Sequence, residues 1–245
     1  MLTKDHAICI RAVDYSETSQ ILSFFTRENG KISAIAKGAK RQKSNFDGPI
    51  ETFTSGNIVF TDSKKQKLAT LTEFQQQSTF TALAEDLFAL HCASFAAELT
   101  ELMTDDYDPH PQLFDQLLEL LKNLSNTKNK TEALTLLILF QLALLKQVGL
   151  QPVLNACTNC KNNFNTDWPI VYFCHSANGL ICRDCEPSFE DKIKLSKNAA
   201  NSLANLKLLA SAKQSTLTEI EKLLIHHFTE TLNRPPKMAK YILKN

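Results

Sequence analysis

Apolar and polar residues alternate over short runs in the first 75 positions, a period of two that is typical of β-strands. Residues 31–37 show it most clearly: Ile32, Ala34 and Ala36 share one face, and the residues between them share the other. Five such runs predict strands at 6–13, 20–26, 31–37, 54–61 and 67–74, with residues 62–65 as the loop of the last hairpin. Five short strands in so few residues favour a small β-barrel over a layered α/β domain.

Near residue 80 the spacing of apolar residues changes to the three- and four-residue steps of an α-helix. The spacing predicts helices at 81–103, 113–124, 131–148, 196–210 and 216–232. Pro109 and Pro111 suit the start of the second helix, and Gly149 suits the end of the third, which is apolar nearly all round and is expected at the centre of a bundle. The pattern therefore predicts an α+β multidomain chain, with a five-stranded barrel over residues 1–78 and an α-helical bundle domain over residues 79–245.

The chain of 245 residues is long enough to bury a full core, and its 43% hydrophobic and 22% charged content is ordinary for a soluble protein. The longest apolar run, 133–145, is too short to span a bilayer. The first residues lack the layout of a signal peptide and fit a strand instead. We therefore expect a cytoplasmic protein without membrane contact. In that compartment, its seven cysteines favour metal binding over disulfides.

Four of the cysteines form two close pairs with the spacing Cys-x-x-Cys: Cys157, Cys160, Cys182 and Cys185. Four thiolates can surround a tetrahedral zinc ion, although the loop between the pairs, 161–181, is slightly longer than the usual ~15–20 residues. A closed shell of four sulfurs leaves no open position for catalysis. We therefore expect one structural Zn²⁺ per chain in a knuckle at 155–188, with redox-active thiols or a metal-free cluster as the alternatives.

The remaining cysteines need separate interpretations. Cys174 and His175 lie between the two pairs, and either could replace one of the four ligands. Neither belongs to a Cys-x-x-Cys pair, so we expect Cys174 to be a buried or free thiol. Cys9, in a predicted strand, and Cys92, in an apolar helix, are expected in the core.

Charge is unevenly distributed along the chain, although the net charge is only +1. Residues 1–80 have 11 basic and 8 acidic side chains, residues 191–245 have 10 and 4, and the segments between them are acidic. Unless it arises by chance, such asymmetry indicates a polyanionic partner at the basic ends.

The densest group of cations follows the third predicted strand, where a glycine lets the backbone turn. The cations of this loop, with two more on the preceding strand pair, are our candidate DNA contacts: Arg27, Lys31, Lys37, Lys40, Arg41 and Lys43. The loop lacks the spacing of a Walker loop, and a solvated surface loop is the alternative. On a five-stranded barrel, however, such a loop favours phosphate binding. Phe25 or Phe46 could stack on bases or belong to the core.

The C-terminal segment 234–244 is also basic, with four cations and no acid. It could be a frayed end, a second phosphate contact or a docked peptide. The sequence lacks the short motifs of α/β-hydrolases, zinc metalloproteases and dinucleotide-binding enzymes. We therefore do not expect an enzyme.

The order of these features resembles the RecO family of bacterial DNA repair proteins. The resemblance is most specific near the N-terminus, in a Glu-x-Ser segment (Glu17, Ser19), a Phe-Thr-Arg-Glu-x-Gly turn at 25–30 and the basic loop. It continues in residues 149–152, ahead of the first cysteine pair, and in residues 178–179, ahead of the second. It covers essentially the whole chain.

Two features depart from the family's pattern. Only one glycine, Gly179, precedes the second cysteine pair, where paired glycines are common in the family. The basic tail contains Pro235, Pro236 and Ala239 in place of a more basic, serine-containing run.

The resemblance implies an OB-fold domain, a helical domain and a structural zinc where the cysteines are kept. It also implies binding of single- and double-stranded DNA, annealing of complementary strands, and partnership with RecR and the C-terminal tail of SSB, so that RecA is loaded on SSB-coated DNA at the nucleoid. We expect the SSB tail in a hydrophobic cleft of the bundle, rimmed by cations from residues 192–213. The alternatives are a zinc-containing interaction scaffold without direct DNA contact and a zinc-dependent nucleic-acid enzyme.

Overall fold

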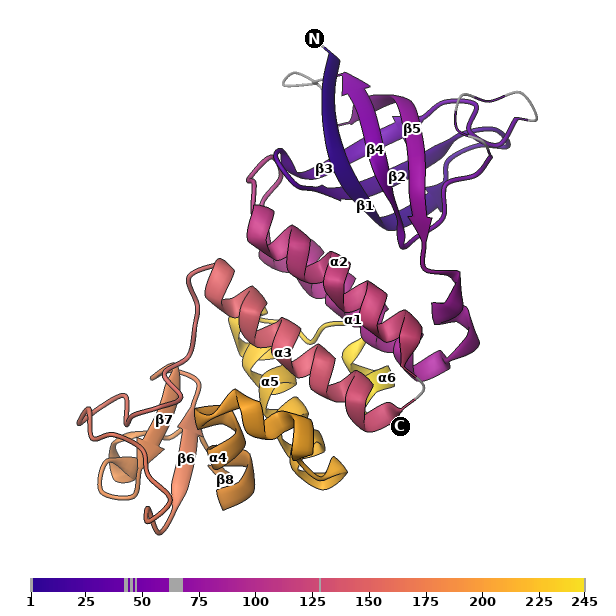
Figure 1. Ribbon diagram of the computed structural model, residues 1–245. Coiled ribbons are helices and arrows are strands. Elements are labelled where there is room, and N and C mark those ends of the chain that lie inside the picture. The colour runs from indigo at the N-terminus through magenta and orange to yellow at the C-terminus, as the bar shows by residue number, and fades with distance from the viewer. Residues whose placement is uncertain are drawn as a thin grey trace. The chain divides into compact units, whose positions relative to one another are not determined.

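The N-terminal part of the chain is a closed five-stranded barrel with the strand order β1-β2-β3-β5-β4 (Figure 1). The computed structural model describes residues 2–41, 44, 46, 48–61, 68–127 and 129–244, without the side chain of Thr79. The strands are β1 (Leu2–Asp14), β2 (Gln20–Thr26), β3 (Gly30–Ala36), β4 (Thr54–Thr61) and β5 (Ala69–Thr79). Neighbouring strands are antiparallel except β3 and β5, which are parallel. The predicted OB-type barrel is therefore confirmed.

The alternation along β3 sorts its side chains as the sequence predicts. Ile32, Ala34 and Ala36 are buried in the barrel core, where they pack with Leu22 and Phe24 of β2. Cys9 lies in the same core, as expected. The predicted hairpin loop at 62–65 lies outside the described residues.

Two strands are longer than the sequence pattern predicts. The pattern starts the first strand at residue 6, but β1 begins at Leu2 and pairs with the end of β4. The pattern ends the last strand at residue 74, but β5 continues through a run of three glutamines to Thr79, paired with Thr54–Asn57. Glutamine and serine have weak strand preference, so only the pairing with β4 extends this strand.

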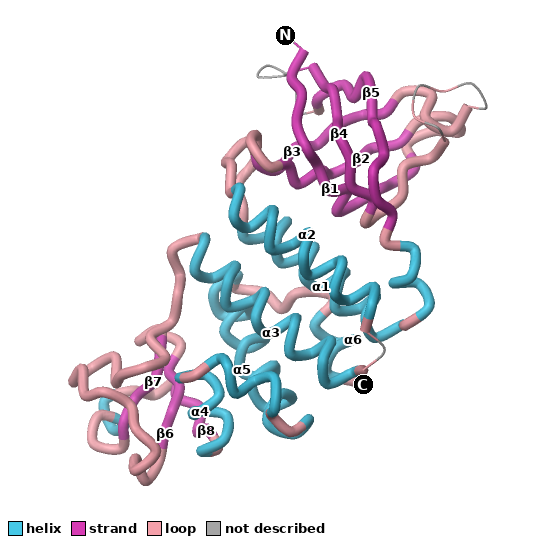
Figure 2. The backbone as a smooth tube through the Cα atoms, viewed as in Figure 1, coloured by secondary structure: helices cyan, strands magenta, loops and turns pink. Residues whose placement is uncertain are grey.

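Helices make up most of the remaining chain (Figure 2). They are η1 (Thr81–Glu85), α1 (Leu87–Met103), α2 (Pro111–Asn126), α3 (Lys130–Gln147), η2 (Glu186–Ser188), α4 (Lys197–Ala204), η3 (Leu206–Ser211), α5 (Gln214–Leu232) and α6 (Ala239–Leu243). The predicted helix at 196–210 is two elements, because Asn205 leaves the helical backbone and its side chain accepts a hydrogen bond from the N–H of Lys207. The second helix starts at Pro111, where the prolines predict it.

Helix α3 ends in the way that Gly149 predicts. Gly149 has φ +77°, the N–H of Gly149 donates to Lys146 and the N–H of Leu150 donates to Leu145. This pair of bonds is a Schellman motif, which satisfies carbonyls that the helix leaves free. Side chains on several faces of α3 are buried, as its nearly uniform apolar pattern predicts.

The chain packs as two compact units, Met1–Glu85 with Ala97–Asn126, and Asp86–Ala96 with Thr127–Asn245. The second unit contains a small antiparallel sheet of β6 (Val171–Cys174), β7 (Gly179–Cys182) and β8 (Lys192–Leu195), in the order β7-β6-β8. Within the ranges described above, no helix has the length and apolar character needed to cross a membrane.

Candidate metal centre and nucleic-acid interface

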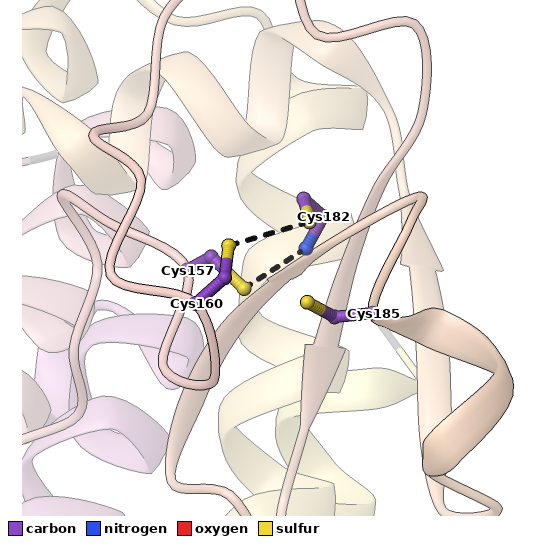
Figure 3. A group of neighbouring side chains, drawn as sticks. All are labelled: Cys157, Cys160, Cys182 and Cys185. Carbon is purple, nitrogen blue, oxygen red and sulfur yellow. Dashed lines mark hydrogen bonds between the residues drawn. The ribbon is translucent and has the colours of Figure 1, made fainter.

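The four cysteines of the two Cys-x-x-Cys pairs come together in the second unit (Figure 3). The sulfurs of Cys157, Cys160, Cys182 and Cys185 all lie within 4.8 Å of one another. The Sγ atoms of Cys160 and Cys182 are 3.8 Å apart. A tetrahedron with Zn–S bonds of ~2.3 Å has sulfurs about 3.8 Å apart. The donor set and its spacing therefore fit a metal ion.

Each pair sits on a tight turn. In the first turn, the N–H of Lys161 donates to the carbonyl of Cys157 at 2.9 Å, and Lys161 takes a left-handed φ of +64°. In the second, Cys182 ends β7 and its carbonyl accepts from the N–H of Cys185 at 3.2 Å. The N–H of Cys182 also points to the sulfur of Cys157, at 3.5 Å. The backbone thus aims all four side chains at one point.

The departure from paired glycines before the second cysteine pair has a structural explanation. Asn178 adopts φ +49°, a left-handed conformation that asparagine tolerates better than most residues. Gly179 has no such substitute, because a Cβ there would lie 2.4 Å from the carbonyl oxygen of Val153 and 2.6 Å from Oγ1 of Thr158. One glycine is therefore enough, provided that it is Gly179.

Hydrogen bonds prepare one thiol of the cluster for metal binding. Burial alone would raise the pKa of Cys157, but backbone N–H groups of Cys160, Cys182 and Asn159 outweigh it and lower the pKa to about 7. Burial and the neighbouring thiols, Cys185 first, raise the pKa of Cys182 to about 12. Four adjacent thiols cannot all ionise without a cation, because each thiolate disfavours the next. A bound divalent metal would remove this conflict.

Cys174 and His175 both have partners other than the four-cysteine cluster. Cys174 is fully buried, and its thiol donates to Oδ1 of Asp191 at 3.1 Å. Burial would raise the pKa of Asp191, but hydrogen bonds from Ser176 and Cys174 lower it to about 2. Cys174 is therefore a buried thiol, as expected. Cys92 is also buried, and burial raises its pKa well above the ordinary value.

His175 instead faces a residue of α5. Its Nδ1 lies 2.9 Å from Nδ1 of His227, and the two rings meet edge to face. Sequence reasoning considered His227 only with its neighbour His226, as a poor joint metal site. The signal that it missed is the apolar spacing of α5, which turns His227 inward among buried residues.

The basic loop after β3 is fixed against the loop that joins β1 to β2. The N–H of Lys40 donates to the carbonyl of Thr18 at 3.1 Å, and the N–H of Gly38 donates to Oγ of Ser19 at 3.3 Å. Lys37 and Arg41 are exposed. Neither of them forms an ion pair with any residue that the structure describes. The loop therefore holds two unneutralised cations in solvent.

Three of the other candidate cations have acidic or carbonyl partners within the first unit. Nζ of Lys40 lies 2.7 Å from Oδ2 of Asp14, with 28% of the lysine side chain exposed. The guanidinium of Arg27 forms two parallel hydrogen bonds with Asp115, at 3.1 and 3.0 Å. These bonds lower the pKa of Asp115. Arg27 remains 42% exposed.

Lys31 is the most enclosed of the candidates. Its Nζ donates to the carbonyls of Glu101 and Thr104, both at 2.8 Å, and lies 3.4 Å from Asp106. Only 15% of its side chain is exposed. A lysine in this position satisfies the free carbonyls at the C-terminus of α1 and favours the negative end of its dipole.

The remaining predictions for the interface have different outcomes. Lys43 lies outside the described residues. Phe25 and Phe46 are 0% and 6% exposed, so their alternative role in base stacking is wrong and their core role is confirmed. The basic tail is not frayed over 239–243, where it forms α6 and buries Ile242.

A closed five-stranded barrel with a basic loop, joined to helices that hold a four-cysteine metal site, defines a multidomain protein of the OB-fold type. Residues 1–80 match the family model described as "Recombination protein O N terminal", and residues 84–240 match "Recombination protein O C terminal". The chain therefore belongs to the RecO family. This membership assigns it to DNA repair and recombination, as the sequence resemblance predicts.

Individual relatives agree with this assignment over nearly the whole chain. The chain is 32% identical over 237 residues to the DNA repair protein RecO of Bacillus velezensis, covering 94% of this chain and 89% of that protein. It is 31% identical over 249 residues to the DNA repair protein RecO of Bacillus pumilus, covering 99% and 94%.

Proposed function

We propose that this protein is a non-catalytic recombination mediator of the cytoplasm and nucleoid. It binds single- and double-stranded DNA, anneals complementary strands and, with RecR, helps to load RecA on SSB-coated DNA. The family assignment supports the class of activity. The observation that carries the DNA contact is the anchored basic loop, in which Lys37 and Arg41 are exposed and without an acidic partner among the described residues.

Annealing by such a surface needs no bond chemistry. Two DNA strands repel each other through their phosphates, and a protein that neutralises some of these charges lowers the repulsion. Binding then releases counterions, so affinity falls as salt rises. In this proposal Lys37, Lys40 and Arg41 contact phosphates, together with Lys43. Lys31 acts mainly on α1, and Arg27 extends the surface only if it exchanges Asp115 for a phosphate.

The test is a double alanine variant of Lys40 and Arg41, compared with a double alanine variant of Lys4 and Lys122. Both pairs lie in the first unit, and both changes remove two positive charges. We expect the loop variant to bind an oligonucleotide more weakly and with a shallower salt dependence, by roughly 0.7 per lost phosphate contact on single strands. Equal affinities and salt slopes in the two variants would exclude the loop as the DNA contact.

We also propose that the cysteine cluster holds one structural Zn²⁺. Cys157, Cys160, Cys182 and Cys185 would fill its four positions, which leaves none for a substrate or water. The ion would supply folding energy to a sheet that has few large apolar side chains. Such a role agrees with a mediator and not with a zinc enzyme.

The acidic, Phe-ended tail of SSB is the partner that we propose for the second unit. A hollow of about 270 Å³ lies between α4, η3 and the start of α5, within the basic stretch predicted for this contact. Leu208 lines the hollow and is 41% exposed, and Lys213 lies at its rim. A peptide titration should show weaker binding by a Lys213→Glu variant than by a Lys146→Glu control. Equal binding would exclude this hollow.

A further inference from the structure

The outer face of β1, β2 and β3 is divided into a covered end and an open end. At the covered end, the ring of Phe25 packs against Phe114 of α2, with ring centroids 6.3 Å apart. The neighbouring Lys31 donates to carbonyls at the C-terminus of α1. This end of the face is therefore occupied by the helices of the same unit.

At the open end, apolar side chains cross the three strands in one row. Val13 of β1 pairs with Ile21 of β2, which pairs with Ile35 of β3. Val13 is 45% exposed, and the two isoleucines are half-buried. Two positions beyond Val13, Tyr15 is 64% exposed. It is the most exposed aromatic residue in the part of the chain that the structure describes, and it was not among the residues that the sequence suggested for stacking.

Tyr15 belongs to the loop on which the basic loop rests. Its N–H donates to the carbonyl of Ser19 at 2.9 Å, which closes the β1–β2 turn. The same turn accepts the N–H groups of Gly38 and Lys40, and the preceding Asp14 accepts Nζ of Lys40 at 2.7 Å. The exposed tyrosine and the exposed cations are therefore parts of one ridge with a fixed backbone.

We propose that this ridge reads the unpaired bases of a single strand, with Tyr15 as the stacking residue. The bases would lie on Tyr15 and the row of Val13, Ile21 and Ile35, while Lys37 and Arg41 contact the phosphates. An aromatic platform beside a cationic track is the arrangement that single-strand-binding surfaces use, because every base has a π-face and every linkage a charge. This inference rests on the proposed DNA contact and adds a preference for unpaired strands to it.

The experiment compares Tyr15→Ala with Tyr107→Ala, which removes a tyrosine of the same unit that is 44% exposed in another loop. Both proteins are titrated with an oligothymidine and with a duplex of the same length, at several salt concentrations. Tyr15→Ala should weaken binding of the single strand roughly 5- to 150-fold, with little change for the duplex, since paired bases cannot stack on a side chain. The salt slope should not change, because no phosphate contact is lost.

A second variant tests the contact directly. Tyr15→Trp, made together with Trp168→Phe so that residue 15 carries the single tryptophan of the chain, should bind like the wild type and lose fluorescence when a base stacks on the indole. Unchanged fluorescence on saturation, or unchanged single-strand affinity in Tyr15→Ala, would overturn the stacking proposal. In that case a weaker Lys40/Arg41 variant would still support the phosphate contact, whereas a wild-type protein that binds no DNA would overturn both.

Discussion

Nδ1 of His175 lies 2.9 Å from Nδ1 of His227, and this contact joins the small sheet beside the cysteine cluster to helix α5. A proton can occupy only one of the two facing nitrogens, so at least one imidazole must be neutral. Burial first, and then His175 and His226, lower the pKa of His227 to about 4. The contact is therefore stable only while His227 stays uncharged.

Acid should weaken this contact before it protonates the buried histidine. The unfolded chain takes up the proton near pH 6.5 and the folded chain only near pH 4, so the free energy of unfolding should fall between these values, by up to roughly 3 kcal/mol. His227→Phe should remove most of this decrease, and His226→Ala should retain it. Denaturant titrations at pH 7 and pH 5 measure the difference, and parallel curves for wild type and His227→Phe would contradict the assignment.

Glu221 should have the opposite pH dependence. It is fully buried in α5, where Nε2 of Gln141 donates to its Oε1 at 2.8 Å. Burial raises its pKa to about 8, so the carboxyl group is neutral at pH 7. The unfolded chain loses this proton near pH 4.5, and stability should therefore decrease as the pH rises from about 4.5 to 8. Glu221→Gln should be insensitive over that range. If wild type and variant respond alike to pH 6 and pH 8.5, Glu221 is not the cause.

Metal removal should destabilise the protein rather than inactivate a catalytic site. Elemental analysis should find one zinc per chain, and Cys182→Ser should lose it and melt at a lower temperature. Cys174→Ser is the matched control, since Cys174 hydrogen-bonds to Asp191 and should not contribute to metal binding. Equal metal content in the two variants would contradict the four-cysteine site.

Gly179 should tolerate no side chain, in contrast to Gly149. Both have positive φ, but a Cβ on Gly149 would meet no atom within 4 Å, whereas one on Gly179 would clash with the backbone of Val153. Gly149→Ala should cost about 1 kcal/mol of strain, and Gly179→Ala roughly 2–3 kcal/mol or more. Thermal melts of the two variants make the comparison, and equal losses would mean that the knuckle relaxes around the added methyl group.

Lys31 and Lys37 lie on the same strand and its exit, yet they should respond differently. Lys31→Met removes two hydrogen bonds at the C-terminus of α1 and should cost about 1–2 kcal/mol of stability. Lys37→Met, at an exposed position, should cost less than about 0.5 kcal/mol but weaken DNA binding. The opposite result, with Lys37 structural and Lys31 required for DNA, would reverse their proposed roles.

Sequence patterns predicted those features that depend on local periodicity and spacing. The inner face of β3, the glycine cap of α3 and the four-cysteine set all follow from neighbouring residues. The extension of β5 depends on pairing with β4, which no local pattern encodes. The histidine contact joins residues 52 positions apart.

The outcome for the basic residues has the same physical origin. Arg27, Lys31 and Lys37 look equivalent in the sequence, and only the packing of α1 and α2 against the barrel provides the first two with internal partners. Likewise, the sequence could not rank Tyr15 above Phe25, because both follow apolar residues and only burial separates them.

The central claim is that the barrel's basic loop binds DNA through phosphates. The most direct measurement is the affinity of the wild-type protein for a single-stranded oligonucleotide over a range of salt concentrations. With Lys37, Lys40 and Arg41 in contact, the logarithm of the binding constant should fall linearly with the logarithm of salt, with a slope of about −2 or steeper. Absence of binding at low salt, or an affinity that does not depend on salt, would contradict the claim.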